Sequence, residues 1–166
     1  MISKNIKIFL AGHKGMVGSA IFKKLKKDGY KKIITVSKKK LNLLDQKKVE
    51  KFLKVKKPKV VIIAAAKVGG ILANNNFKAN FIYENITIQS NIIHSSFLSG
   101  VKNLIFLGSS CIYPKKAKQP IKESYFMTGP LEETNDAYSI AKIAGAKMCM
   151  EYSKQYKLNY KTLMPA

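Results

Sequence analysis

With 166 residues, the chain has the length of a single ordinary domain, and the 46% of its residues that are hydrophobic suffice for a buried core. The net charge is +22, yet all 31 basic residues are lysine. Because proteins that read nucleic-acid sequence rely on the planar fork of arginine, this composition argues against a specific nucleic-acid partner and indicates a general drift toward lysine.

The cysteine content and the first apolar run bear on the compartment. Cys111 and Cys149 are too few for a disulfide framework, which favours a reducing interior. The run from Ile6 to Ala11 is interrupted by Lys7 and is too short for a signal peptide or a membrane span. We therefore expect a cytoplasmic protein without a membrane segment, and no spacing of metal ligands predicts a metal site.

Hydrophobic periodicity predicts strands that alternate with helices along the chain. Strands are expected over residues 6–11, 32–36, 59–66, 103–107 and 160–164, and helices over residues 17–28, 45–57, 77–98 and 137–156. Residues 114–135, with Pro120, Gly129 and Pro130, predict a long surface loop. This order is typical of an α/β fold with a doubly wound parallel sheet and helices on both faces. Residues 1–166 are expected to form one dinucleotide-binding domain of the Rossmann type.

Three glycines at the first strand-to-helix turn predict a dinucleotide site. Gly12, Gly15 and Gly18 allow a tight turn and let the backbone approach a pyrophosphate at the positive end of the next helix. Their G-x-x-G-x-x-G spacing is the variant found in short-chain dehydrogenases/reductases. The residues expected to contact the cofactor in this turn are Gly12, His13, Lys14, Gly15, Met16, Val17 and Gly18.

The residues after the second expected strand favour NADP(H) over NAD(H). An NAD site has a carboxylate there for the ribose 2′-hydroxyl, but this chain has Lys38, Lys39 and Lys40 and no acid before Asp45. Lys14 in the glycine turn adds another cation. Since cations favour a 2′-phosphate, NADP(H) is the expected cofactor, with Lys38, Lys39 and Lys40 among its contacts.

A Ser-Tyr-Lys set predicts carbonyl reduction. Ser109 follows the apolar strand at 103–107, and Tyr138 and Lys142 are four residues apart on one helix face. Ser109 is expected to hydrogen-bond a carbonyl oxygen and Tyr138 to donate or accept its proton, while Lys142 orients a ribose and lowers the pKa of Tyr138. Such a set moves a proton onto oxygen while a hydride reaches carbon.

Six segments carry a resemblance to a known family. They are residues 12–21, 66–71, 90–94, 107–114, 118–120 and 138–145. The sequence resembles the GDP-L-fucose synthase family of extended short-chain dehydrogenases/reductases, over nearly all of this chain but only about the first half of such an enzyme. The resemblance implies NADPH-dependent 3,5-epimerisation of GDP-4-keto-6-deoxy-D-mannose with reduction at C4, and a homodimer for the full-length enzyme.

The resemblance also implies roles for single residues. Cys111 is expected to be the base of the epimerisation. Cys149 lies between Met148 and Met150 on an expected helix, and this position, not the resemblance, predicts that it lies in the core. The acid histidine and the GDP-sugar domain of the family would follow Ala166, so the chain is expected to be a fragment, a truncated reading frame or half of a split protein, and inactive alone. Further expected cofactor contacts are Leu107, Gly108, Ser109, Ser110, Lys142, Pro165 and the loop at 67–70.

Two alternatives stay open. The first is another nucleotide-sugar epimerase or dehydratase of the same superfamily, which Cys111 disfavours because those enzymes usually carry Thr there. The second is a non-catalytic NADP(H)-binding module, which has no need of Ser109, Tyr138 and Lys142.

Overall fold

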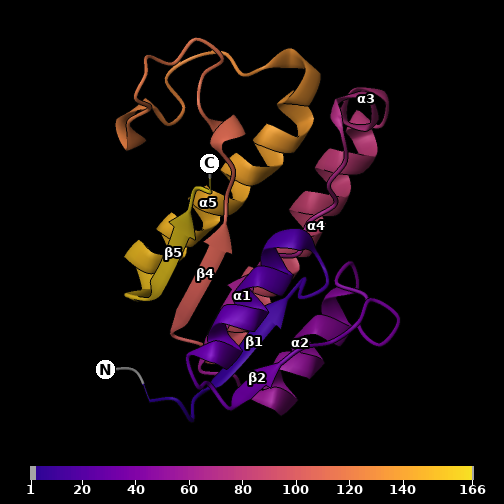
Figure 1. The fold of residues 1–166 in the computed structure, drawn as a ribbon, viewed down its shortest axis with the longest axis vertical. Coiled ribbons are helices and arrows are strands. Elements are labelled where there is room, and N and C mark those ends of the chain that lie inside the picture. Colours follow the sequence, from indigo (N-terminus) through magenta and orange to yellow (C-terminus); the bar gives the residue numbers. More distant parts are fainter. Residues whose placement is uncertain (1–2, 166) are drawn as a thin grey trace.

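A parallel sheet of five strands in the order β2-β1-β3-β4-β5 forms the centre of the protein (Figure 1). The computed structural model describes residues 3–165. The strands are β1 (Lys7–Ala11), β2 (Lys32–Ile34), β3 (Val60–Ile63), β4 (Asn103–Leu107) and β5 (Asn159–Leu163). Every neighbouring pair is parallel, which confirms the predicted fold class.

Helices connect the strands. They are α1 (Met16–Lys27), α2 (Gln46–Lys56), α3 (Ile71–Asn76), α4 (Lys78–Leu98) and α5 (Asp136–Tyr156). The loop at 114–135 contains two short 3₁₀ turns, η2 (Glu123–Tyr125) and η3 (Glu133–Asn135), and a third, η1 (Ser110–Ile112), directly precedes it. The sequence reading did not predict α3, which a break at Phe77 (φ −122°) separates from α4.

Two predicted strands are shorter than expected. The strand predicted at 59–66 ends at Ile63, because β1 ends at Ala11 and the last bond between the two segments runs from the Ala64 amide to the Ala11 carbonyl. The strand predicted at 32–36 ends at Ile34. There the chain enters a turn in which the amides of Lys40 and Leu41 both donate to the Ser37 carbonyl.

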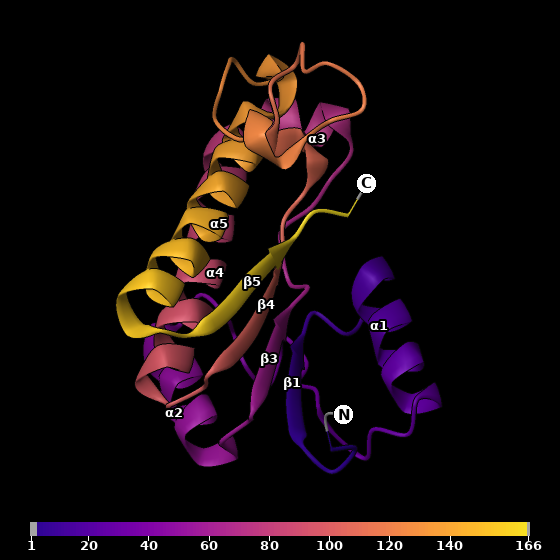
Figure 2. The ribbon, with the colours of Figure 1, turned by 90° about the vertical axis from the view of Figure 1, so that its left-hand side faces the viewer.

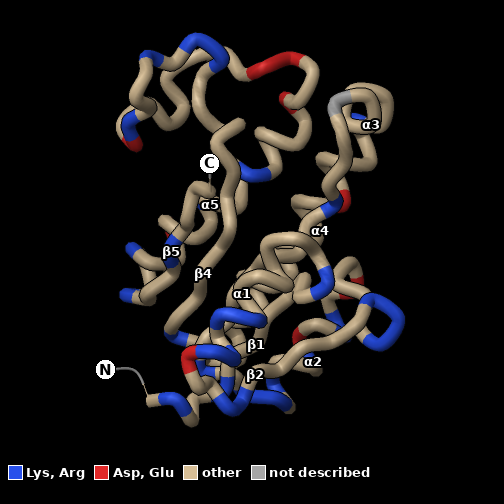
Figure 3. Tube along the Cα trace, in the orientation of Figure 1, with Lys and Arg blue, Asp and Glu red and all other residues tan. Residues whose placement is uncertain are grey.

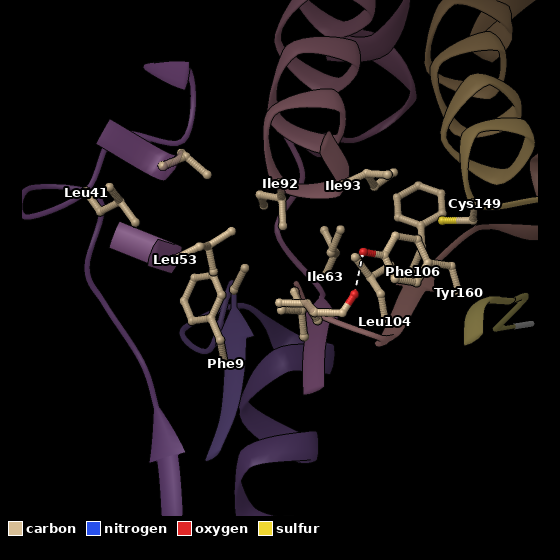
Figure 4. Packing of buried hydrophobic residues seen from close by; sticks show 14 residues of the cluster. Phe9, Leu41, Leu53, Ile63, Ile92, Ile93, Leu104, Phe106, Cys149 and Tyr160 are labelled. Carbon is tan, nitrogen blue, oxygen red and sulfur yellow. Dashed lines mark hydrogen bonds between the residues drawn. The ribbon is translucent and has the colours of Figure 1, made fainter. Parts of the chain in front are cut away.

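The helices form a layer on each face of the sheet. Figure 2 shows α2, α4 and α5 on one face and α1 on the other. The larger core lies under the three helices, with the hydroxyl of Tyr160 donating to the Val101 carbonyl at 2.9 Å (Figure 4). Its fully buried side chains include Phe9, Leu53, Ile63, Ile92, Ile93, Leu104, Phe106 and Cys149. Burial of Cys149 agrees with its predicted place in the core.

The order of the strands places a crevice at one edge of the sheet. The chain passes from β1 to β2 on one side and then crosses to β3 on the other side of β1. In such sheets ligands bind beyond the carboxyl ends of the two strands at which the direction reverses. The carboxyl ends of β1 and β3 are therefore the expected position of the site. Across residues 3–165, no helix has both the length and the apolar character needed to traverse a bilayer.

Candidate functional site

A cavity of about 600 Å³ lies at the carboxyl ends of β1 and β3. Three segments form its walls: the glycine turn at 12–18, the turn at 36–44 after β2, and the segment at 64–68 after β3. Phe9 and Ala11 of β1 and Glu84 and Ile88 of α4 complete the lining. Every residue of the glycine turn that the sequence predicted as a cofactor contact, from Gly12 to Gly18, lines this cavity.

The fold needs glycine at two positions of this turn. Gly12 has φ +88°, and a Cβ there would lie 2.5 Å from the Ala65 amide nitrogen. A Cβ on Gly18 would lie 2.1 Å from the Gly12 carbonyl oxygen. At Gly15 the nearest atom would be 3.5 Å away, an ordinary contact. Packing alone therefore explains Gly12 and Gly18 but leaves Gly15 open to a role toward a ligand.

The start of α1 is suited to an anion. Its N-cap is Gly15, which has no side chain to accept a hydrogen bond from the first amides of the helix. These amides and the helix dipole together attract phosphate groups. The N-terminus of α1 opens into the cavity through Met16 and Val17, and Met16 is 86% exposed. The residues present thus fit the pyrophosphate of a dinucleotide.

The lysines predicted to select NADP(H) divide into two groups. Lys14 and Lys38 line the cavity, whereas Lys39 and Lys40 are exposed and do not belong to its lining. Lys67 also lines it, but its Nζ forms an ion pair of 2.5 Å with Glu84. Figure 3 shows that lysines lie on many segments of the chain, though hardly on α4, rather than gathered along one element.

The catalytic candidates come together beside this cavity, at the end of β4. Ser109 is the second residue after the strand, and its Oγ accepts a hydrogen bond of 3.5 Å from the Cys111 amide. From α5, the Nζ of Lys142 donates to the Leu107 carbonyl at 2.7 Å and lies 5.6 Å from the centre of the Tyr138 ring. None of these residues belongs to the lining of the cavity at β1 and β3.

The prediction that Lys142 lowers the pKa of Tyr138 is wrong. Burial raises the pKa of Tyr138 to about 12, and the charge of the Cys111 thiolate adds to this rise. Burial lowers the pKa of Lys142 to about 8, against the opposing effect of Cys111. The ammonium of Lys142 donates its hydrogen bond to the Leu107 carbonyl, and desolvation of the phenol therefore determines the direction in which the pKa of Tyr138 shifts. Tyr138 is consequently a protonated phenol at neutral pH.

The two cysteines have different surroundings. Cys111 is a free thiol, partly exposed, in η1. Cys149 is also free but completely buried, and burial raises the pKa of its thiol to about 12. A nucleophile or base must be a thiolate, so Cys111 is the thiol available for chemistry.

The end of the described chain lies against the end of β4. A Cβ on Gly108 would come 2.4 Å from Sδ of Met164, so the Met164 side chain packs directly over this glycine. Pro165 follows Met164 and is exposed. Leu107, Gly108, Ser109, Ser110, Lys142 and Pro165 thus lie outside the cavity, toward the catalytic end of the sheet, and their contacts with the cofactor stay predictions.

Sequence reasoning missed part of the cavity. The turn at 41–44 and the α4 residues Glu84 and Ile88 were not predicted as lining residues. The apolar Leu41, Leu43 and Leu44, in a segment without helix or strand periodicity, were the available signal. Of the loop at 67–70, predicted to lie beside the cofactor, Lys67 and Val68 line the cavity, whereas Gly69 and Gly70 do not belong to its lining. Within residues 3–165, no three His, Cys, Asp or Glu side chains are grouped as a metal site.

Comparison with known proteins assigns the family. Residues 8–166 match the NAD dependent epimerase/dehydratase family. The chain belongs to this family. It is 56% identical to GDP-L-fucose synthase of Sinorhizobium fredii, over 96% of the chain and 50% of that protein. It is 51% identical to GDP-L-fucose synthase of Escherichia coli, again over 96% of the chain and 50% of that protein.

Solved structures of epimerase/dehydratase relatives have the same fold. The GDP-mannoheptose C4 reductase MlghC of Campylobacter jejuni, with NADP bound, superposes with a TM-score of 0.95 at 44% identity, over 99% of this chain and 52% of that one. A GDP-L-fucose synthetase of Naegleria fowleri bound to NADP gives 0.88 at 28% identity, over 99% and 51%. The chain therefore has the Rossmann fold of an NAD(P)-dependent enzyme family, and it spans about half the length of the relatives it matches.

Proposed function

We propose that this chain is the cofactor-binding half of a GDP-L-fucose synthase, which converts GDP-4-keto-6-deoxy-D-mannose to GDP-L-fucose with NADPH. One observation carries the proposal: Ser109 and Cys111 at the end of β4 lie with Tyr138 and Lys142 of α5 beside a cavity built for a dinucleotide. The high identity to GDP-L-fucose synthases supports the substrate.

Tyr138 and Ser109 serve the reduction at C4, and Cys111 serves the epimerisation at C3 and C5. NADPH, when bound, supplies the hydride for C4. Tyr138, whose pKa burial raises still further above neutral pH, donates its proton to the C4 oxygen. The Ser109 hydroxyl already accepts a bond from the Cys111 amide, so its own proton is free to hold the same oxygen. The Cys111 thiolate removes the proton at C3 and then at C5, and each resulting enolate regains a proton on its opposite face from an acid in the other half of the enzyme, an isomerase step that precedes reduction.

Charge supports NADPH rather than NADH as the reductant. Lys38 lines the cavity after β2, where a dinucleotide places its adenosine ribose, and Lys14 lines it from the glycine turn. Both ammonium groups can reach a 2′-phosphate there. No acidic residue of the turn at 36–44 competes for them.

A second substrate has its own support. The C4 reductase MlghC resembles this chain with a TM-score of 0.95, so a GDP-linked 4-keto-heptose is the alternative substrate. A reductase that acts only at C4 has no need of a base at Cys111. Another nucleotide-sugar epimerase or dehydratase, or a non-catalytic NADP(H) module, is a weaker candidate beside the complete catalytic set.

Assembly and location complete the proposal. We infer a homodimer of the full-length enzyme through α4 and α5, because Leu98, Met150 and Tyr156 expose 45%, 40% and 43% of their surface on these two adjacent helices. We place the enzyme in the cytoplasm, where Cys111 stays a reduced thiol.

The test uses this chain joined to the second half of the E. coli relative. The joined enzyme receives GDP-4-keto-6-deoxy-D-mannose or a GDP-4-keto-heptose with NADPH, and the products are identified by NMR. Formation of GDP-L-fucose is the expected result. Turnover of the heptose alone would favour the second substrate, and turnover of neither by a folded enzyme that binds NADPH would overturn the catalytic proposal.

A further inference from the structure

Helix α4 carries three buried amide side chains that each bind the backbone of a different segment. Asn85, Gln89 and Asn91 expose 2%, 2% and 8% of their surface. A buried amide costs stability unless its polar atoms find partners. Each of the three therefore fixes whatever segment it bonds to relative to α4.

Asn85 holds the segment after β3. Its Oδ1 accepts from the Lys67 amide at 2.8 Å, and its Nδ2 donates to the Lys67 carbonyl at 2.9 Å. Its Nδ2 also donates to the Phe81 carbonyl of α4 at 2.9 Å, which fixes the amide group itself. The neighbouring Glu84 pairs with the Lys67 ammonium at 2.5 Å. Both the backbone and the side chain of this cavity-lining residue are thus bound to α4.

Asn91 holds the opposite wall. Its Nδ2 donates to the Leu43 carbonyl at 2.9 Å. Leu43 belongs to the turn at 41–44 that lines the cavity after β2. This turn has no strand partner, since β2 already ends at Ile34. A bond to a side chain of α4 replaces the missing sheet contact.

The third amide reaches the catalytic helix. Gln89 donates to the carbonyl of Ala141, the residue before Lys142. Along α4 the three amides therefore bind one cavity wall, the catalytic helix and the other cavity wall. Ile88, between them, lines the cavity itself.

We propose that Asn85 and Asn91 are positioning residues that set the separation of the two walls of the NADPH site, with α4 as their common support. The proposal rests on the cofactor assignment above. The order of the strands assigns each wall to one half of the cofactor. Leu43 lies on the β2 side, with the adenosine, and Lys67 follows β3, toward the catalytic end at β4.

This assignment predicts that substitutions of Asn85 and Asn91 change the Kd values of two probes differently. The chain is titrated with NADPH and with adenosine 2′,5′-bisphosphate, which is the adenosine half alone. Asn91→Ser is expected to raise the Kd of both probes by the same factor, about tenfold for a lost hydrogen bond. Asn85→Ser is expected to raise the Kd of NADPH by about tenfold and to leave the Kd of the bisphosphate close to that of the unmodified chain.

Two controls on the same helix separate positioning from stability. Ser95→Ala changes a fully buried polar group whose hydroxyl has no hydrogen-bond partner within residues 3–165. Ile93→Ala destabilises the core without touching an amide. Both should bind the two probes as the unmodified chain does at temperatures where they are folded. If Asn85→Ser and Asn91→Ser affect binding no more than Ile93→Ala does, the proposal is overturned.

Two measurements do not depend on the folding of the asparagine variants. Glu84→Gln removes the charge that holds Lys67 at a partly exposed site, and it should weaken NADPH more than the bisphosphate. Hydrogen exchange of the Lys67 amide in the unmodified chain should be as slow as in β3, and rapid exchange would refute the Asn85 clamp. An unmodified chain that is folded but binds neither probe would instead refute the cofactor assignment.

Discussion

The Nζ of Lys142 donates a 2.7 Å hydrogen bond to the carbonyl oxygen of Leu107, the last residue of β4. The same ammonium lies 4.7 Å from the centre of the Phe106 ring. Lys142 is only 4% exposed, so this buried charge joins the catalytic helix to the end of the strand that carries Ser109. The contact fixes the position of α5, and the burial that accompanies it lowers the pKa of Lys142.

The buried charge of Lys142 predicts a dependence of stability on pH. Its pKa falls from 10.5 to about 8 on folding. Between these pH values the unfolded chain binds more protons at this residue than the folded chain does, so the free energy of unfolding rises with pH, by about 3 kcal/mol at most. Urea unfolding of the unmodified chain and of Lys142→Met, each at about pH 8 and about pH 10, measures the difference.

Comparison of the two proteins isolates this contribution, since the other titrating groups are common to both. Lys142→Met keeps a long side chain but removes the charge and its bond to Leu107. The rise with pH should be smaller in the variant than in the unmodified chain. Equal slopes would show that Lys142 is as easily protonated in the folded protein as in the unfolded chain.

The chain should bind NADPH more tightly than NADH. Lys14 lines the cavity and can contact a 2′-phosphate through a charge-assisted hydrogen bond. Lys14→Ala should reduce the preference for NADPH by about tenfold, measured by fluorescence titration with both cofactors. The exposed Lys116→Ala, which makes the same change in net charge, should leave the preference intact. Equal affinities of the unmodified chain for the two cofactors would refute the assignment to NADPH.

Local patterns explain what the sequence could predict. The strands β1, β3 and β4 and the glycine turn at 12–18 could be predicted from the sequence. Their signals, an apolar run for a strand and spaced glycines for a turn, consist of residues that are close together in the sequence. The break between α3 and α4 at Phe77 carries no such local signal. The two strands predicted too long end early because their partners end or the chain turns.

The parts of the site that escaped prediction depend on contacts far apart in the sequence. Asn91 and Leu43 are 48 residues apart, and Asn85 and Lys67 are 18 apart. The direction of the Tyr138 pKa was wrong for the same kind of reason. Helix spacing places the Lys142 ammonium near Tyr138. It does not show that this ammonium donates to the Leu107 carbonyl or that the Tyr138 phenol is buried.

Gly18→Ala should destabilise the glycine turn. The added Cβ would lie 2.1 Å from the Gly12 carbonyl oxygen. Because this oxygen belongs to the backbone of the glycine turn, it can move away only if the conformation of the turn changes. A cost of about 1–3 kcal/mol is expected from such overpacking, measured by urea unfolding, together with weaker binding of NADPH. Gly70→Ala is the control, because a Cβ at Gly70 would have no atom of a described, non-adjacent residue within 4 Å. A Gly18→Ala protein as stable as this control would contradict the close approach of α1 to the turn.

Tyr138→Phe tests the proton donor in the enzyme joined to the second half of the E. coli relative. The phenol is the group proposed to protonate the C4 oxygen, and general acid catalysis contributes roughly 10²–10⁴-fold to such a rate. We expect kcat for reduction to fall by that factor while the Kd of NADPH changes little. Tyr156→Phe, on the same helix but 43% exposed, should keep the activity. Reduction by Tyr138→Phe at the unmodified rate would show that the phenol is not the acid.

Cys111→Ser separates the two reactions in the same joined enzyme. Serine keeps the size of the side chain but is a far weaker acid than a thiol, whose ordinary pKa is about 8.5, so the thiolate base disappears. Tyr138 and Lys142 remain, and the unepimerised ketone is then expected to be reduced directly to a GDP-6-deoxyhexose of different stereochemistry. In deuterium oxide, NMR should show no deuterium entering C3 or C5, in contrast to the unmodified enzyme. Cys149→Ala, which removes the buried thiol in the core, should exchange normally once folded. Full exchange by Cys111→Ser would assign the epimerisation to another base and would leave Cys111 as a neighbour of the reduction site.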